Sequence, residues 1–181
     1  MESRILTVNG IESDGSGSTD LLGATLAARG FKWIDVNQPI RNAWQARWKA
    51  QKDAKDIIRQ ARDGDYLICH SYGGRKSGIA MRGVKFKAVF MFRPAMSRWH
   101  KFPMYQDTKI FCVYSKQDYT ILMGSLALFH PFGLAGFSGF KSPFVKNIKS
   151  QGAHSDDFKP GAIEHWADFV ENSITLIERN V

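Results

Sequence analysis

The sequence predicts an α/β protein with three layers, in which helices cover both faces of a mainly parallel sheet of five or six strands. Short apolar runs rich in β-branched residues alternate along the chain with amphipathic segments, a pattern typical of parallel sheets. A chain of 181 residues is long enough for one domain with a substantial core, and 44% of its residues are hydrophobic. We find no internal repeat and no linker, so residues 1–181 are expected to form a single domain.

The first elements are marked by residues that end strands and helices. The β-branched run 4–8 is followed by Asn9-Gly10, which indicates a strand that enters a turn. A loop rich in Gly and Ser comes next, and Gly30 ends the helix that follows this loop. The elements predicted in this part are a strand over 4–8, a helix over 18–29 and a strand over 31–36.

The segment 42–62 has the pattern of an amphipathic helix. Its apolar residues recur at spacings of three and four, with Lys, Arg and Asp between them. They include Trp44 and Trp48, which we expect to anchor this helix in the core. Apolar, strand-like runs predict the later strands, over 66–69, 86–92, 109–114 and 145–150. The helical spacing and the turn at 70–74 predict the later helices, over 72–82 and 162–179.

Residues 66–74 carry the most specific signal in the chain. The apolar run of the third strand ends at Cys69 and continues into His-Ser-Tyr-Gly-Gly at 70–74. This is the sequence form of a nucleophile elbow, a tight strand-to-helix turn that exposes one hydroxyl group. The turn needs small side chains two positions before and two positions after the serine, and Cys69 and Gly73 meet that need around Ser71.

Three residues supply the parts of an activated nucleophile, in the order Ser71, Asp118 and His154. A serine hydroxyl needs a base to take its proton, and a histidine base needs a carboxylate to fix its tautomer. Each of the three follows a predicted strand, and ligands of parallel sheets bind at the carboxyl ends of the strands. We therefore expect the three side chains to meet at one edge of the sheet.

Other residues compete for two of these roles. Asp107 is the alternative acid. Among the other histidines, His70 lies within the elbow and is expected to point away from the nucleophile, and His165 is expected to be structural on the last helix. His100 and His130 lie in segments for which the sequence gives no clear prediction.

These motifs resemble those of the α/β-hydrolase superfamily, and the resemblance to a small member covers nearly the whole chain. It rests on residues 70–74, on 114–121 around the acid and on 152–158 around the base. It implies the α/β-hydrolase fold without a large cap domain and without a cofactor. It also implies a serine hydrolase that cleaves a small-molecule carboxylic ester or thioester through an acyl-enzyme intermediate, with amide cleavage left open.

The same resemblance implies an oxyanion hole made of backbone N–H groups. One donor would be Tyr72, at the start of the elbow helix, and the second would be Ile11, in the loop after the first strand. Members of the superfamily often carry His-Gly in that loop, whereas this chain carries Asn9-Gly10. Since only the backbone must donate, Asn9 is expected to shape the loop.

Composition narrows the classes of partner and cofactor. The net charge of +8 is spread along the chain without a dense Lys/Arg tract, so we expect weak binding to anionic surfaces and no specific nucleic-acid site. The five histidines and the two cysteines lack metal-ligand spacing, so no metal is expected. No disulfide framework and no signal peptide are expected, which favours the cytoplasm.

Residues 120–140 contain no Asp, Glu, Lys or Arg. Their length would span a bilayer, but their glycines and Pro131 break a helix, so we interpret them as an apolar flap or pocket wall. Docking of this segment on lipid or on a partner chain is the alternative. A second function class also stays open, namely an inactive hydrolase-fold protein that binds an anionic partner through its basic surface.

Overall fold

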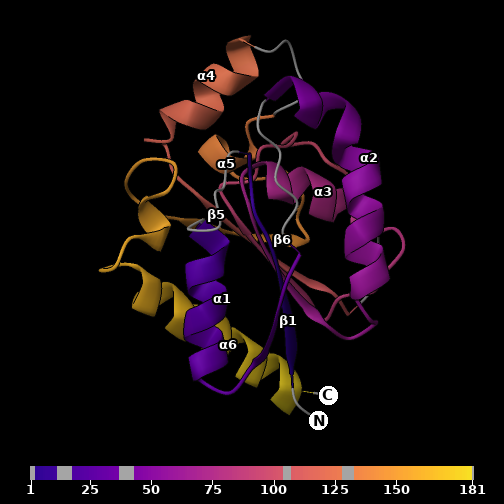
Figure 1. Ribbon diagram of the computed structural model, residues 1–181. Helices are drawn as coiled ribbons and strands as arrows, with labels where there is room; N and C mark the ends of the chain where they lie inside the picture. The colour runs from indigo at the N-terminus through magenta and orange to yellow at the C-terminus, as the bar shows by residue number, and fades with distance from the viewer. Residues whose placement is uncertain (1–2, 12–17, 37–42, 104–106, 128–132, 181) are drawn as a thin grey trace.

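A six-stranded parallel sheet lies at the centre of the computed structural model, which describes residues 3–11, 18–36, 43–103, 107–127 and 133–180 (Figure 1). The order of the strands across the sheet is β2-β1-β3-β4-β5-β6, and every neighbouring pair is parallel. The strands are β1 (Arg4–Val8), β2 (Lys32–Asp35), β3 (Tyr66–His70), β4 (Ala88–Phe92), β5 (Lys109–Tyr114) and β6 (Val145–Lys149). The predicted parallel sheet is confirmed, with the larger of the two expected strand numbers.

Helices cover both faces of this sheet. Helices α1 and α6 pack together on one face, and α2 and α3 pack together on the other (Figure 1). The helices are α1 (Ser18–Ala28), α2 (Ala43–Gln60), α3 (Tyr72–Ala80), α4 (Tyr119–Ala127), α5 (Ala135–Ser138) and α6 (Ile163–Arg179), and a 3₁₀ turn, η1, spans Asp156–Phe158. The predicted three-layer α/β architecture is thereby confirmed.

Strand β3 shows how the sheet separates two hydrophobic cores. Leu67 and Cys69 face the core under α2 and α3, while Tyr66 and Ile68 face the core under α1 and α6. Successive side chains of a strand point to opposite faces, so a strand covered on both sides must be apolar at every position. This requirement explains why the neighbouring strand β4 has the uninterrupted apolar sequence Ala-Val-Phe-Met-Phe.

The face that α2 turns to the core differs from the prediction. Trp48 is 78% exposed, so its expected role as a core anchor is wrong, and the side chain of Trp44 lies outside the described residues. The buried positions of α2 include three alanines and one isoleucine: Ala46, Ala50, Ala54 and Ile57. Small side chains on this face let α2 pack closely against α3.

The order of the strands creates a switch point between β1 and β3. From β1 the chain proceeds to β2 on one side, whereas β3 and all later strands lie on the other side. In open parallel sheets, the crevice at the carboxyl ends of the strands beside such a point is where ligands bind. The loop that begins at Asn9 and the turn at Ser71 both lie there, because they follow β1 and β3.

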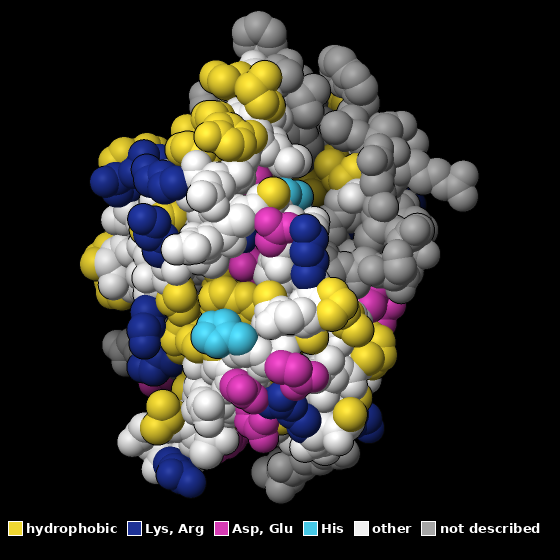
Figure 2. Space-filling model, turned by 90° about the vertical axis from the view of Figure 1, so that its left-hand side faces the viewer, with side chains coloured by type: hydrophobic (Ala, Val, Ile, Leu, Met, Phe, Trp, Pro, Cys, Tyr) yellow, Lys and Arg dark blue, Asp and Glu magenta, His cyan; other side chains and the backbone are white. Residues whose placement is uncertain are grey.

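Two short helices occupy much of the apolar segment 120–140. Helix α4 exposes Tyr119, Met123 and Leu126, and Figure 2 shows hydrophobic side chains gathered at the upper end of the molecule, where Figure 1 places α4. Residues 128–132, including His130 and Pro131, lie outside the described residues. No helix in the described part of the chain has both the length and the apolar character needed to cross a bilayer.

Candidate active site

Ser71 lies at a sharp turn between β3 and α3 and adopts an unusual backbone conformation. Its φ of 53° and ψ of −124° fall in a region that L-residues rarely adopt. Hydrogen bonds fix this conformation: the Ser71 N–H donates to the Phe92 carbonyl at 3.0 Å, and the Ser71 carbonyl accepts from Ala95 at 2.8 Å and from Gly74 at 3.0 Å. Strain of this kind costs about 1–3 kcal/mol and persists where the surroundings impose it, which is common at functional sites.

Two glycines allow the loop after β1 to lie directly against this turn. A Cβ on Gly73 would come within 2.3 Å of the Val8 carbonyl oxygen, so only glycine fits there. A Cβ on Gly10 would come within 2.9 Å of the Ser71 Cβ and 3.4 Å of its Oγ. The backbone of this loop, which continues to Ile11, is therefore close to the Ser71 hydroxyl.

The side chain of Asn9 ties this loop to the start of α1. Its Nδ2 donates to Asp20 at 2.6 Å, and its Oδ1 accepts from the backbone N–H of Thr19 at 3.1 Å and from the Thr19 hydroxyl. Burial raises the pKa of Asp20. Asn9 is itself 1% exposed, so its amide holds the loop rather than facing a ligand.

The start of α3 is held from the side of α2. The Tyr72 hydroxyl donates to the Ala46 carbonyl of α2 at 2.6 Å, and the Lys76 ammonium lies 5.3 Å from the centre of the Tyr72 ring. Lys76 is fully buried, and burial lowers its pKa to about 8 against the opposing effect of Asp53. These contacts fix the position of the first N–H groups of α3 behind Ser71.

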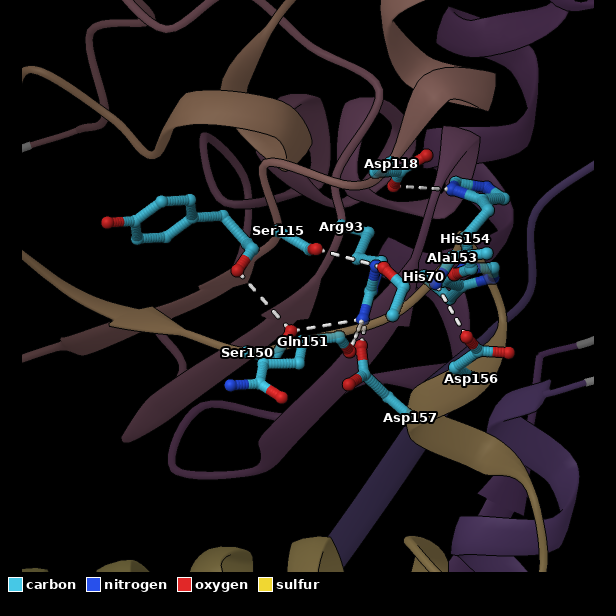
Figure 3. A network of polar contacts seen from close by, with 12 residues as sticks. His70, Arg93, Ser115, Asp118, Ser150, Gln151, Ala153, His154, Asp156 and Asp157 are labelled. Carbon is cyan, nitrogen blue, oxygen red and sulfur yellow. Dashed lines mark hydrogen bonds and ion pairs between the residues drawn. The ribbon is translucent and has the colours of Figure 1, made fainter.

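Asp118 and His154, from loops 36 residues apart in sequence, meet in a hydrogen bond (Figure 3). The Nδ1 of His154 donates to Oδ2 of Asp118 at 2.8 Å, while Oδ1 of Asp118 accepts the N–H of Ile121 at 3.0 Å. Asp118 is fully buried, and the side chain of His154 is 15% exposed. This arrangement places the proton on Nδ1 and leaves Nε2 of His154 as a proton acceptor.

The side chain of His70 forms a hydrogen bond with the backbone of His154. Its Nε2 donates to the His154 carbonyl at 3.0 Å, and the centres of the two rings are 4.5 Å apart. Burial, followed by the nearby His154 imidazole, holds the pKa of His70 well below its usual value. A neutral His70 carries one ring N–H, which this hydrogen bond places on Nε2.

Arg93, directly after β4, holds the loop that carries His154 (Figure 3). Its Nε donates to Asp157, and both side chains are buried. Its two terminal nitrogens donate to the Gly152 carbonyl at 2.7 Å, to the Ser150 hydroxyl at 3.0 Å and to the Gln151 carbonyl at 3.0 Å. Like Ser71, Arg93 has a positive φ, of 45°.

Arg93 was not identified from the sequence as a functional residue. A cationic residue before a proline, at the end of a predicted strand, was the signal that could have indicated it.

The segment after β5 contributes two more contacts to the same loop. The Ser115 hydroxyl donates to the Gly152 carbonyl at 2.9 Å, and the Gly152 N–H donates to the Gln117 side chain at 2.6 Å. Gly152 thus bonds to Arg93 and to the segment that carries Asp118. The loops of the acid and the base are therefore joined by hydrogen bonds between side chains and backbone as well as by the Asp118–His154 bond.

The structure separates Asp107, His100 and His165 from this region. Asp107 lies before β5 rather than after it, is 79% exposed at its side chain and pairs with Lys85 at 3.0 Å. His165 lies on α6, and His100 lines a cavity near the amino end of β5. Within the described residues, Ser71 Oγ makes no hydrogen bond to His154, and no three metal-ligating side chains form a cluster.

The chain is similar to known proteins in structure, at low sequence identity. No protein-family model and no curated protein sequence matches the chain. Alpha/beta hydrolase domain-containing protein 10 from mouse superposes with a TM-score of 0.65 at 14% identity, over 96% of this chain and 90% of that chain. A thermophilic esterase from Thermogutta terrifontis superposes with a TM-score of 0.65 at 14% identity, over 97% of this chain and 84% of that chain. For the monoacylglycerol lipase of Paleococcus ferrophilus, the TM-score is 0.62 at 15% identity, over 98% and 97%. The protein has the α/β-hydrolase fold.

Proposed function

We propose that the protein is a serine hydrolase that cleaves a carboxylic ester or thioester of a small molecule. The observation that carries this proposal is the Asp118–His154 hydrogen bond at the same edge of the sheet as Ser71. A carboxylate that fixes the Nδ1–H tautomer leaves Nε2 free to act as a base. The strained turn at Ser71 supplies the nucleophile that this base would serve.

The reaction runs in two half-reactions. His154 Nε2 takes the proton of Ser71 as its Oγ attacks the carbonyl carbon, and then gives the proton to the leaving alcohol or thiol. A water molecule then attacks the acyl-enzyme while His154 takes its proton, and His154 returns this proton to Ser71 Oγ as the acyl–oxygen bond breaks and the acid is released. The backbone N–H groups of Tyr72 and Ile11 would bind the negatively charged oxygen, and the start of α3 adds a favourable dipole.

The apolar surface of α4 supports an acyl substrate. This helix begins directly after Asp118 and exposes Tyr119, Met123 and Leu126. We propose that it forms a pocket wall or flap over the acyl chain. Two of the superposed proteins, an esterase and a monoacylglycerol lipase, are named for the cleavage of carboxylic esters, which fits the same choice of substrate.

Covalent labelling tests this function directly. A fluorophosphonate probe phosphorylates an activated serine, so we expect labelling of the wild-type protein, no labelling of Ser71→Ala and unchanged labelling of the control Ser173→Ala. Hydrolysis of nitrophenyl esters of increasing chain length should disappear in the same variant. If the wild type is neither labelled nor active, the alternative is an inactive hydrolase-fold protein that binds an anionic partner. Retention on anionic vesicles would then be measured.

Gly10→Ala should lower kcat about 100-fold and lower the unfolding free energy by about 1–3 kcal/mol. The new Cβ would lie 2.9 Å from the Ser71 Cβ, so the serine or the loop with Ile11 must move. Loss of one oxyanion donor typically costs about 10²–10³ in rate. Gly161→Ala is the matched control, because a Cβ there has no atom within 4 Å. Nitrophenyl ester kinetics measure the effect on kcat, and thermal unfolding measures the effect on stability. An unchanged kcat would contradict the assignment of this loop to the oxyanion hole.

A further inference from the structure

A cavity lies at the opposite end of the sheet from Ser71. Its volume is about 570 Å³, within the range of small-molecule sites. It touches the first residues of β5, whereas Asp118 lies beyond the last, and a six-residue strand spans roughly 17 Å. Its lining includes three aromatic residues, Trp99, Phe102 and Phe144, and three lysines, Lys101, Lys109 and Lys141.

Two loops that form the walls of this cavity are fixed to each other and to the core. The Lys141 N–H donates to the Arg98 carbonyl at 2.9 Å, which joins the two segments. The Asn147 side chain bonds both the N–H and the carbonyl of Phe140, at 2.8 and 2.9 Å. The ring of Phe102 packs against Phe140 with 5.0 Å between the centres. These contacts hold the two wall segments in fixed positions relative to each other and to the core.

The lining combines an apolar surface with unpaired positive charge. Trp99 and Phe144 are 70% and 61% exposed, so two large apolar side chains are accessible at this cavity. Lys101, Lys109 and Lys141 surround them, and within the described residues none of these lysines takes part in an ion pair. Asp107, which lies just before β5, pairs with Lys85 at 3.0 Å.

We propose that this cavity binds a small amphipathic carboxylate, an aromatic or alkyl body with one anionic head. The aromatic walls would cover the apolar body, and the three lysines would hold the carboxylate without competition from a protein acid. Aromatic side chains with a few placed polar groups are the usual lining of such sites. Because the cavity and the Ser71 region lie at opposite ends of β5, this binding does not depend on the proposed hydrolysis.

Binding is tested on the Ser71→Ala protein, so that turnover cannot contribute. We expect saturable fluorescence enhancement of 1-anilinonaphthalene-8-sulfonate, displaced by decanoate but at least tenfold less well by decanol. Decanoate should also raise the melting temperature, since a ligand that binds only the folded state stabilises it. Replacement of Lys101, Lys109 and Lys141 by glutamine should weaken decanoate binding at least tenfold.

The matched control removes the same charge from another face. The exposed lysines of α2, Lys49, Lys52 and Lys55, are replaced by glutamine, and decanoate binding should be unchanged. The proposal is overturned if decanoate does not bind, if both triple variants weaken binding equally, or if decanol binds as well as decanoate. Retention on anionic vesicles gives a further test. The proposal is also overturned if the three cavity lysines are needed for this retention and decanoate does not reduce it.

Discussion

Asp118→Asn is expected to lower kcat for ester hydrolysis on the order of 10⁴-fold while the fold is kept. The amide of asparagine offers a donor to His154 Nδ1, which favours the tautomer with the proton on Nε2. His154 then cannot take the proton of Ser71. The new side chain still has an oxygen that can accept the Ile121 N–H, the bond that Asp118 makes now at 3.0 Å.

The measurement is kcat with a nitrophenyl ester for the wild type, Asp118→Asn and the control Asp107→Asn. The control removes the alternative acid, which is 79% exposed and pairs with Lys85. It should keep wild-type activity. A loss of less than tenfold in Asp118→Asn, or a larger loss in Asp107→Asn, would contradict the assignment of the acid. The melting temperature of both variants shows whether either loss reflects unfolding.

Arg93→Met is expected to cost about 3–5 kcal/mol of unfolding free energy. Arg93 is fully buried, and its loss would leave the Asp157 carboxylate buried without its cationic partner. The variant would also lose the hydrogen bonds to Ser150, Gln151 and Gly152 that hold the segment before His154. Urea unfolding measures the cost. Arg29→Met is the control. The acids around Arg29 are exposed, so this substitution should lower the unfolding free energy by about 1 kcal/mol or less.

A double variant separates stability from positioning at Arg93. Arg93→Met combined with Asp157→Leu removes both buried charges, so much of the lost unfolding free energy should return. The hydrogen bonds from the guanidinium to the loop remain absent, so kcat should stay low while KM changes little. Full recovery of kcat in the double variant would show that Arg93 affects only stability and does not position His154.

Particular residues show which features of the fold and of the candidate site can be predicted from the sequence. A strand was predicted over 86–92, and the structure has β4 at Ala88–Phe92, where the apolar run leaves no polar face for water. Ser71, Asp118 and His154 could be placed at one edge of the sheet, because each follows a strand and parallel strands share their carboxyl ends. Such inferences depend only on periodicity and chain order, which are properties of the sequence.

Helix α2 and the segment 120–140 show where these inferences stop. The period of 3.6 residues predicted α2, but the choice between Trp48 and the alanines as its buried face was made by the fit against α3. The helix α4 forms across Gly124, where a Cβ would meet no atom within 4 Å. A count of helix-breaking residues over 120–140 therefore did not exclude a short helix there.

The alternation of apolar and amphipathic segments by itself determined the three-layer parallel fold, because burial of both faces of a sheet demands that pattern. Only the tertiary structure decided what surrounds His154. Its Nδ1 bonds to Asp118, its carbonyl bonds to His70, and its loop is held by Arg93. These partners come from the ends of three different strands, β3, β4 and β5. Their contacts depend on how the strands are ordered and how the loops pack, which no local pattern in the chain encodes.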